Sequence, residues 1–249
     1  MRQISISIFF PAFNEEQNII SMVERTVAVA ENCPYIGAYE VLIIDDGSTD
    51  ATPHLADDLA NRFETVRVVH HVVNAGYGAA LKTGFHEARM EYVFFTDADM
   101  QFDLLEIEHL LIHVPDYRVV IGYRAPRRDP FMRLLNAAGW NMLNRLFFGL
   151  RIRDIDCAFK IFERSLLEHI TIVSDGAMVN AELLVRLRRE GVEIKEVPVS
   201  HLPRVYGSPT GAKLSVIFRA IRELLVLYAG DLGSRSPTQN ITHSRTHSV

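Results

Sequence analysis

Cysteine is nearly absent from this chain, which has only Cys33 and Cys157 among its 249 residues. Two cysteines so far apart give neither a disulfide framework nor the spacing of a zinc site, so we expect a protein of the reducing cytosol. No stretch reaches about 18 uninterrupted apolar residues, so the sequence predicts no transmembrane helix. The apolar residues 4–10 are too few, and lack the basic flank, for a signal peptide.

The chain also lacks an excess of positive charge. Its net charge of −5 argues against a general nucleic-acid-binding protein. One stretch departs from that average. From Arg118 to Arg153 there are eight arginines, no lysine and a single acid, Asp129. Such local positive charge indicates an anionic partner, a phosphate or a lipid surface. The plainer interpretation is a solvated basic face.

Several catalytic motifs are missing as well. The chain has no GxxxxGK[ST] phosphate loop, and its glycine-rich stretch NAGYGAAL (74–81) lacks the third glycine of the dinucleotide fingerprint. The stretch GSTD (47–50) is not a nucleophile elbow. Glu106, His109 and His113 share a helix face, but we assign no metal there because histidines on an exposed face are more often solvated.

Apolar runs alternate with helical patterns along the chain, which predicts an α/β fold with a mostly parallel sheet and helices on both faces. The expected strands are 4–10, 39–45, 66–72, 92–97, 117–123 and 192–199. The expected helices include 15–31 capped by Asn14, one capped by Ser48 or Thr49 and ending near 63, 104–113, 131–150, 179–190 and 212–229.

Polar clusters follow three of these strands: PAFNEE (11–16), DDGSTD (45–50) and DADMQ (97–101). In parallel sheets, ligands bind at the carboxyl ends of the strands. If the third segment is extended, the oxygens of Asp97, Asp99 and Gln101 face one side and suit Mg²⁺ or Mn²⁺. The alternative is a polar turn with an aspartate capping the next helix. A cation beside acids suits a nucleoside diphosphate, because it neutralises the departing diphosphate.

These clusters, with NAGYGAALKTG (74–84), occur in an order and spacing that resembles the family 2 glycosyltransferases of the GT-A fold. More narrowly, they look like the dolichyl- or polyprenyl-phosphate mannose or glucose synthases. The resemblance continues through RDIDCAFKIFER (153–164) and NAELLVRLRREGVEIKEVPVSHLPR (180–204) to Gly207, and covers roughly residues 4–225. It implies one domain over 1–232, with a nucleotide-sugar half (1–123), an acceptor- and membrane-facing half (124–232) and a disordered tail (233–249).

The resemblance also implies roles for individual residues. The nucleotide-sugar site would comprise Pro11, Phe13, Glu15, Ile43, Asp45, Asp46, Asp97, Ala98, Asp99 and Arg204. The metal ligands would be Asp97, Asp99 and Gln101, and the acceptor site would comprise Arg124, Arg133, Asn180 and Glu182. Candidate catalytic carboxylates are Asp97, Asp99, Glu182, Asp154 and Asp156. The plainer interpretation is that Asp154 and Asp156 pair with nearby arginines and that Glu182 stabilises a helix start.

The implied activity is inverting, Mg²⁺- or Mn²⁺-dependent transfer of a hexose from a donor of the GDP-mannose or UDP-glucose type to a polyprenyl phosphate. The enzyme would sit at the cytoplasmic membrane face. Two departures affect the acceptor. GSPTGAK (207–213) replaces the G-x-S-K of many relatives, which displaces the lysine to Lys213 or removes it, and the sequence predicts none of the C-terminal membrane helices that many relatives carry. Two alternatives remain open: a hydroxyl acceptor, which needs a carboxylate base, and a catalytically silent nucleotide-sugar-binding subunit.

Overall fold

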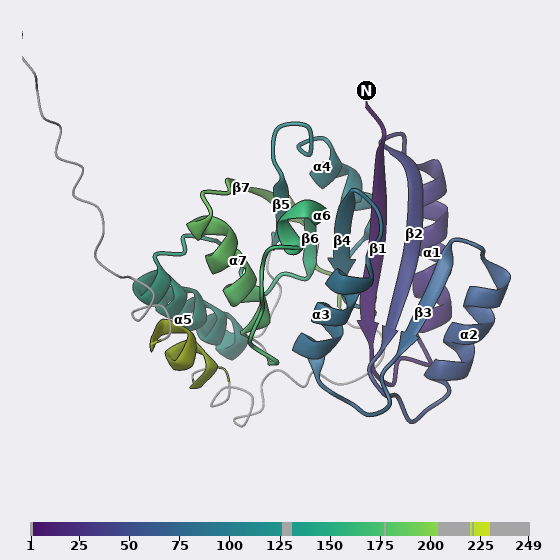
Figure 1. Cartoon of the computed structure of the whole chain (residues 1–249), viewed down its shortest axis with the longest axis horizontal. Helices are drawn as coiled ribbons and strands as arrows, with labels where there is room; N and C mark the ends of the chain where they lie inside the picture. The colour runs from purple at the N-terminus through teal and green to yellow at the C-terminus, as the bar shows by residue number, and fades with distance from the viewer. Residues whose placement is uncertain (1, 126–130, 177, 204–219, 221, 230–249) are drawn as a thin grey trace, which may run out of the picture.

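The computed structural model describes residues 2–125, 131–176, 178–203, 220 and 222–229, with the side chains of 131–137 left aside. Within these residues seven strands form one sheet in the order β3-β2-β1-β4-β6-β5-β7 (Figure 1). The strands are β1 (Ile4–Ala12), β2 (Ile36–Asp45), β3 (Val66–His70), β4 (Tyr92–Thr96), β5 (Val119–Arg124), β6 (Phe159–Glu163) and β7 (Ile194–Val199).

Helices alternate with these strands. They are α1 (Ile19–Asn32), α2 (Thr52–Arg62), α3 (Tyr77–Glu87), a 3₁₀ turn at Leu104–Glu106, α4 (Ile107–Leu111), α5 (Phe131–Phe148), α6 (Arg164–Leu167) and α7 (Val179–Arg189). Residues 222–229 are also helical, whereas most of the expected helix 212–229, the tail 233–249, Arg204 and Lys213 lie outside the described residues. No helix in the described part of the chain is long and apolar enough to cross a membrane.

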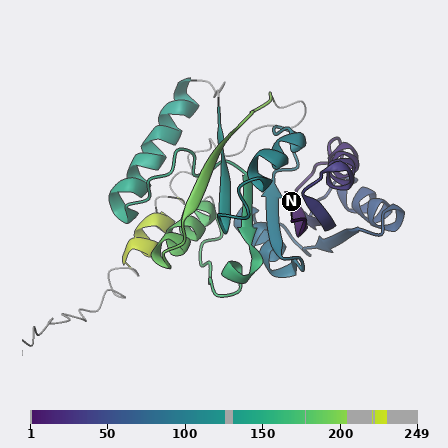
Figure 2. The same cartoon turned by 90° about the horizontal axis from the view of Figure 1, so that it is seen from above.

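The sheet is parallel except for β6, which runs antiparallel to both of its neighbours, β4 and β5. The prediction of a mostly parallel α/β fold is confirmed, but it omitted β6. Because β6 and β7 come from the second half of the chain, both halves build one continuous sheet (Figure 1). Seen from above, α5 lies at the opposite end of the molecule from α1 and α2 (Figure 2).

Aromatic rings fix α3 against the sheet. Phe9 of β1, Phe95 of β4 and Phe162 of β6 are fully buried, and Phe85 of α3 lies 5.2, 5.6 and 5.8 Å from their ring centroids. A Cβ on Gly84 would stand 2.2 Å from the Phe9 ring, so this close approach of helix and sheet requires glycine. The packing sets the position of the first turn of α3, which carries part of the site.

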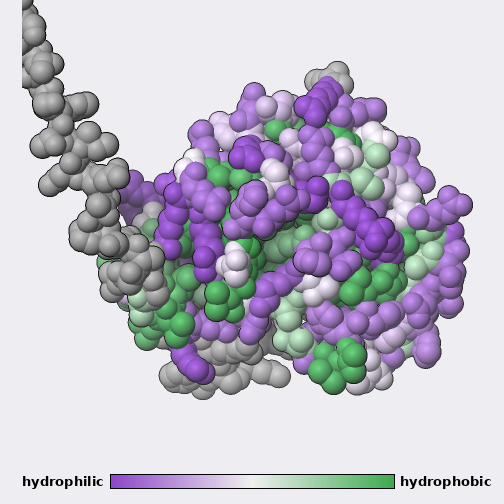
Figure 3. All heavy atoms as spheres, viewed as in Figure 1, coloured by the Kyte–Doolittle hydropathy of each residue, from purple (hydrophilic) through white to green (hydrophobic). Residues whose placement is uncertain are grey.

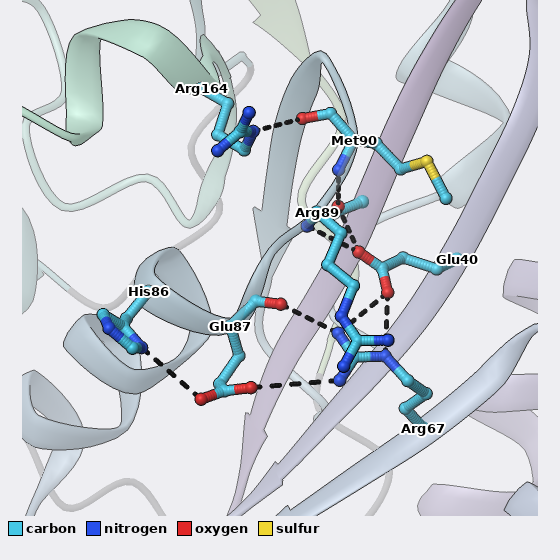
Figure 4. Close-up of polar contacts among 8 residues, drawn as sticks. Glu40, Arg67, His86, Glu87, Arg89, Met90 and Arg164 are labelled. Atoms are coloured by element: carbon cyan, nitrogen blue, oxygen red, sulfur yellow. Dashed lines mark hydrogen bonds and ion pairs between the residues drawn. The ribbon is translucent and has the colours of Figure 1, made fainter.

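A buried polar cluster holds the turn between α3 and β4 (Figure 4). Glu40 accepts hydrogen bonds from Ser7 Oγ at 2.6 Å, from the Arg89 backbone N–H at 2.8 Å and from Arg67 Nε at 2.9 Å. Burial alone would raise the pKa of Glu40, but these three donors lower it below its ordinary value. Arg67 also donates to the Glu87 carbonyl, so one ionised carboxylate joins β1, β2, β3 and the end of α3.

Candidate active site

The loops after β1 and β2 are tied together at the carboxyl edge of the sheet. The Asn14 backbone N–H donates to Ser48 Oγ at 2.9 Å, and the Thr49 backbone N–H donates to Asn14 Oδ1 at 2.8 Å. Asn14 adopts a left-handed φ of 56°. The expected helix caps are therefore wrong: Asn14 and Ser48 cap no helix but join two loops, because α1 begins only at Ile19 and Ala51 is the N-cap of α2.

The predicted nucleotide-contacting residues of these loops differ in accessibility. Phe13 is 45% exposed, and Pro11 and Glu15 are half-buried. The Glu15 carboxylate accepts a hydrogen bond from Asn18 Nδ2 at 2.6 Å. Ile43 lies two residues before the end of β2 and is fully buried, so its side chain belongs to the core.

Asp45 ends β2 and is enclosed on all sides. It is 2% exposed, its Oδ1 accepts the Ser48 backbone N–H at 3.1 Å, and its Oδ2 lies 2.7 Å from His70 Nδ1. His70 Nε2 in turn lies 3.1 Å from Asp57 Oδ1 on α2. Burial lowers the pKa of His70, but the two carboxylates raise it more, and the net shift is upward from 6.5.

Asp46 points to the opposite face, as adjacent residues of an extended segment do. Its carboxylate accepts the backbone N–H groups of Ala75 at 2.9 Å and Gly76 at 2.8 Å, and it lies 2.6 Å from His71 Nδ1. His71 Nε2 contacts Thr83 Oγ1 of α3 at 2.9 Å. Gly76 has a φ of 94°, which favours glycine. Asp46 therefore fixes the loop that leads into α3.

The acid segment after β4 is a turn. Residues 98–100 bend, Met100 has a φ of 60°, and Asp99 Oδ1 accepts the Gln101 backbone N–H at 3.1 Å. The extended geometry expected for Asp97, Asp99 and Gln101 is therefore wrong, although the turn still presents the three side chains from one short loop. Outside glycine, the left-handed conformations in the described chain are those of Asn14 and Met100, and both lie in edge loops.

Two further contacts hold this acid loop. Tyr77, the first residue of α3, donates its hydroxyl to Asp97 Oδ1 at 3.1 Å. On the other side, the Leu202 backbone N–H donates to the Gln101 carbonyl at 2.8 Å, and Gln101 Nε2 donates to the Leu202 carbonyl at 3.1 Å. The segment that leads to Arg204 is thus joined to the acid loop, although Arg204 itself lies outside the described residues.

Arg124, predicted to bind the acceptor, forms a two-pronged ion pair with Asp154. Arg124 Nε and Nη2 donate to the Asp154 carboxylate at 2.7 and 2.8 Å, and the Arg124 backbone N–H adds a third bond at 3.2 Å. The side chains are 13% and 5% exposed. Asp156, two residues further, is exposed. Arg133 lies in α5, and its side chain is outside the described set.

Glu182 and Asn180 lie in the first turn of α7 and are buried. The fully buried Glu182 carboxylate accepts the Val173 and Ser174 backbone N–H groups at 2.8–3.1 Å and a hydrogen bond from Arg186 Nε at 2.8 Å. Burial would raise the pKa of Glu182, but these donors hold it below its ordinary value. The contacts make Glu182 the anchor of the 172–174 segment.

The acid loop carries the donor types of a cation site. Two carboxylates and one amide oxygen are ligands that Mg²⁺ and Mn²⁺ accept, so Asp97, Asp99 and Gln101 fit the ion by type. Within the described residues, no group of three or more His, Cys, Asp or Glu side chains is arranged to hold a metal ion. Glu106, for example, accepts the Ser200 backbone N–H at 2.6 Å.

Four residues at this edge escaped the sequence interpretation: His70, His71, Tyr77 and Lys160. His70 ends β3 and His71 follows it, just as Asp45 ends β2 and Asp46 follows it. Two adjacent histidines one strand after two adjacent acids could have indicated that they pair. Tyr77 stands inside a glycine-rich stretch that was interpreted only for its glycines. Lys160 interrupts an apolar run, which hid both its burial and the strand around it.

Comparison with known proteins adds a family to this geometry. The family model for glycosyl transferase family 2 matches residues 7–171. Glycosyltransferase AglD of Haloferax volcanii is 32% identical over 209 residues, covering 81% of this chain and 34% of that protein. Dolichyl-phosphate beta-glucosyltransferase ALG5D of Trichomonas vaginalis is 29% identical over 214 residues, covering 79% and 65%. The chain thus spans one third and just under two thirds of the lengths of these relatives.

Among solved structures, glucosyl-3-phosphoglycerate synthase from Mycobacterium tuberculosis, in complex with Mn²⁺, uridine diphosphate and glucosyl-3-phosphoglycerate, superimposes with a TM-score of 0.69. The identity is 21%, and the match covers 91% of this chain and 80% of that one. At that identity the likeness shows a shared fold.

Proposed function

Since this chain belongs to glycosyl transferase family 2, we propose that it transfers a hexose from a nucleoside diphosphate sugar to a polyprenyl phosphate, with inversion and with Mg²⁺ or Mn²⁺. The observation that carries the proposal is the acid loop, held between Tyr77 and Leu202 at the carboxyl edge of a sheet that matches the family. The names of relatives, among them a dolichyl-phosphate glucosyltransferase, support the lipid-phosphate acceptor.

The nucleoside would lie on the joined loops after β1 and β2. Phe13 offers an exposed ring, and Pro11 and Glu15 stand beside it. Asp45 is buried, so its role in binding would be to hold the Ser48 loop and His70 in place. Its carboxylate oxygens would reach a ligand only if that loop moved. A titration with UDP and GDP distinguishes uracil from guanine as the bound base.

The diphosphate would lie at the acid loop. Asp97, Asp99 and Gln101 would hold Mg²⁺ or Mn²⁺, which supplies charge neutralisation for the departing diphosphate. Arg204 would contact the same diphosphate, since its segment is joined to Gln101 through Leu202. The chain's own contribution is to keep these groups oriented before the donor binds, which is the form of catalysis that positioning and electrostatics provide.

Contacts around two of the three candidate bases favour a phosphate acceptor over a hydroxyl. A phosphate is already ionised at neutral pH, whereas a hydroxyl needs a carboxylate to take its proton. Glu182 is fully buried and binds backbone N–H groups, and Asp154 is paired with Arg124. Of these three carboxylates, Asp156 alone is exposed. Arg124 and Arg133 would bind the acceptor phosphate.

Exposed apolar side chains support a peripheral contact with the cytoplasmic membrane face. Met142 and Leu146 of α5 are 66% and 76% exposed, and Leu225 and Val226 of the 222–229 helix are 51% and 60% exposed. Figure 3 shows hydrophobic surface gathered over these two elements. Within a single domain of residues 1–232, the first half would bind the donor and the second half the lipid.

The test is a transfer assay with radiolabelled UDP-glucose and GDP-mannose, Mn²⁺, and two acceptors: a short-chain polyprenyl phosphate and an alkyl glucoside. The proposal requires transfer to the lipid phosphate from one of the donors. Faster transfer to the glucoside would establish the hydroxyl-acceptor alternative. Donor binding without transfer or hydrolysis would instead identify a silent nucleotide-sugar-binding subunit.

A further inference from the structure

Two adjacent valines stand out into water on the loop that joins β3 to α3. Val72 is 98% exposed and Val73 is 68% exposed, and the nucleotide, cation and acceptor sites proposed above use neither. Single exposed apolar side chains are common on protein surfaces, but two neighbouring ones on one loop concentrate apolar area in water. Val72 and Val73 are called the valine tip from here on.

Hydrogen bonds hold the valine tip in place at both of its ends. Before it, the His71 backbone N–H donates to the Asp45 carbonyl at 2.8 Å, and His71 Nδ1 lies 2.6 Å from Asp46 Oδ1. After it, the Asp46 carboxylate accepts the backbone N–H groups of Ala75 and Gly76. Because both ends of the loop are fixed on β2, the two valines stay outside the core.

The loop after β2 supports the valine tip from behind. Gly47 has a φ of 67°, and a Cβ at this position would stand 2.5 Å from the carbonyl carbon of Val73. Only glycine allows the two backbones to approach so closely. The tip therefore rests on Gly47 and has no room to sink towards the sheet.

No charge accompanies the valine tip. Residues 72–81 (VVNAGYGAAL) include no acid, lysine, arginine or histidine, and residues 72–75 are all exposed. Taking a charged group out of water is costly, whereas this exposed stretch presents apolar side chains and one amide. Such a surface suits the boundary between the headgroups and the acyl chains of a bilayer.

The valine tip lies on the same edge of the sheet as the acid loop. Strands β3, β2, β1 and β4 are adjacent in that order and parallel, so the loops that follow β3 and β4 leave the same edge. Three strand spacings of about 4.8 Å separate the two loops by about 14 Å.

The other exposed apolar residues lie at the far end of this edge. Helix α2 packs against β3, and α5 lies at the opposite end of the molecule from α2 (Figure 2). The β3–α3 loop, α5 and the 222–229 helix all lie towards the lower side of Figure 1, the side to which β1 points. In the same view, Figure 3 shows hydrophobic atoms at this lower edge as well as over α5 and the 222–229 helix.

We propose that the valine tip is a second point of contact with a phospholipid bilayer, which together with α5 and the 222–229 helix turns the carboxyl edge of the sheet towards the membrane. The inference rests on the proposed lipid-phosphate acceptor. The charged head of such an acceptor stays at the bilayer surface, so the acid loop reaches it only when this edge faces the bilayer. Contacts on both sides of the acid loop hold the edge in that orientation.

A tryptophan at the tip reports this contact directly. Trp140 is the single tryptophan of the chain, so Val72→Trp is made together with Trp140→Phe. The vesicles contain equal parts of phosphatidylcholine and phosphatidylglycerol, with bromine on the acyl chains. We expect the emission of the introduced tryptophan to shift to shorter wavelength and to be quenched by the bromine.

The matched control is Ile112→Trp, also made with Trp140→Phe. Ile112 is 48% exposed and follows α4, which lies on the opposite, upper side of the molecule in Figure 1. Its tryptophan should show neither the shift nor the quenching, whereas vesicle adhesion in random orientations would affect both reporters equally.

A second experiment tests the consequence for transfer. Replacing both valines by serine should weaken vesicle binding about tenfold, which is roughly what burial of one valine side chain contributes. The KM for a long-chain polyprenyl phosphate in vesicles should rise by a similar factor. Transfer to a water-soluble, short-chain polyprenyl phosphate should stay unchanged, because that acceptor reaches the acid loop without a bilayer.

The inference is overturned if the introduced tryptophan is not quenched, if the double variant binds vesicles as the wild type does, or if both acceptors lose activity equally. A spectral shift caused by UDP or GDP without vesicles would show that the tip closes on the donor, and a shift that depends on protein concentration would show that a second copy covers it; both overturn the inference. A wild type that transfers sugar to neither lipid phosphate overturns the proposed function, whereas transfer to the short acceptor without quenching at the tip overturns this inference alone.

Discussion

Replacing Asp46 by asparagine should damage the fold at the edge of the sheet far more than an exposed acid nearby would. Asp46 is 3% exposed and accepts hydrogen bonds from the Ala75 and Gly76 backbones while contacting His71. An asparagine keeps one acceptor oxygen but turns an NH₂ group towards a donor, so at least one buried N–H loses its partner.

An unsatisfied buried donor costs about 1–3 kcal/mol, and loss of the charge weakens the remaining bonds, so we expect the free energy of unfolding to fall by about 3 kcal/mol. For a domain of this size that corresponds to a fall in Tm of about 10 °C. Differential scanning calorimetry of Asp46→Asn measures it. The control is Asp57→Asn, whose side chain is 59% exposed and contacts only one nitrogen of His70 among the bonds described.

A Tm within about 2 °C of the wild type would refute this reasoning, because it would mean that the 74–76 loop finds other partners at little cost. The result also separates two roles. If Asp46→Asn melts normally but loses nucleotide affinity, Asp46 contacts the ligand directly, as the family resemblance implies. If it melts early and binding falls only in proportion to the unfolded fraction, it is the clamp that its hydrogen bonds describe.

Further predictions concern the cation, a histidine, the membrane and the two substrates. Asp99→Asn should lower transfer by about two orders of magnitude, and normal turnover in that variant or in EDTA would exclude the cation role. The pKa of His70 is raised in the folded state, so the protonated histidine stabilises the fold fully below about pH 6.5, and this stabilisation is lost as the pH rises through the folded-state pKa. In urea unfolding from pH 5.5 to 8.5, the free energy of unfolding should fall with pH for this reason in the wild type and not in His70→Gln. Leu146→Glu should reduce co-sedimentation with anionic liposomes, and equal binding by both proteins would place membrane contact elsewhere. Arg133→Ala should raise KM for the lipid phosphate and Arg204→Ala should weaken the donor, each by roughly 1.5–3 kcal/mol, and equal donor losses in both would contradict the split.

Alternation of apolar strands with helical patterns was enough to predict the parallel part of the sheet. The pattern failed at β6, where Lys160 stands in a five-residue run that is otherwise mostly apolar. A lysine normally marks a surface, and only the tertiary contacts with Cys157 and Asn180 make this one an interior residue. The missed strand and the missed lysine therefore have one cause.

The edge loops were located correctly but their conformations were not. Asparagine is a residue type that often caps helices, but Asn14 instead hydrogen-bonds Ser48, which lies on another loop 34 residues away. The acid segment was expected to be extended, yet Met100 takes a left-handed φ that propensities disfavour for its residue type. Both outcomes depend on long-range contacts, which a local pattern does not contain.

The antiparallel strand β6 has a consequence for how the chain can be made and divided. β4 and β5 are close in sequence but do not pair; each pairs with β6, which leaves the ribosome about 35 residues after β5. Until then the nascent sheet ends at β4 with an unpaired hydrophobic edge, the kind of surface that invites pairing with another chain. A fragment that stops near residue 123 would keep that edge permanently, so we expect the proposed nucleotide-sugar half to be unstable when it is cut there, whereas a cut after β6 would leave β4 covered.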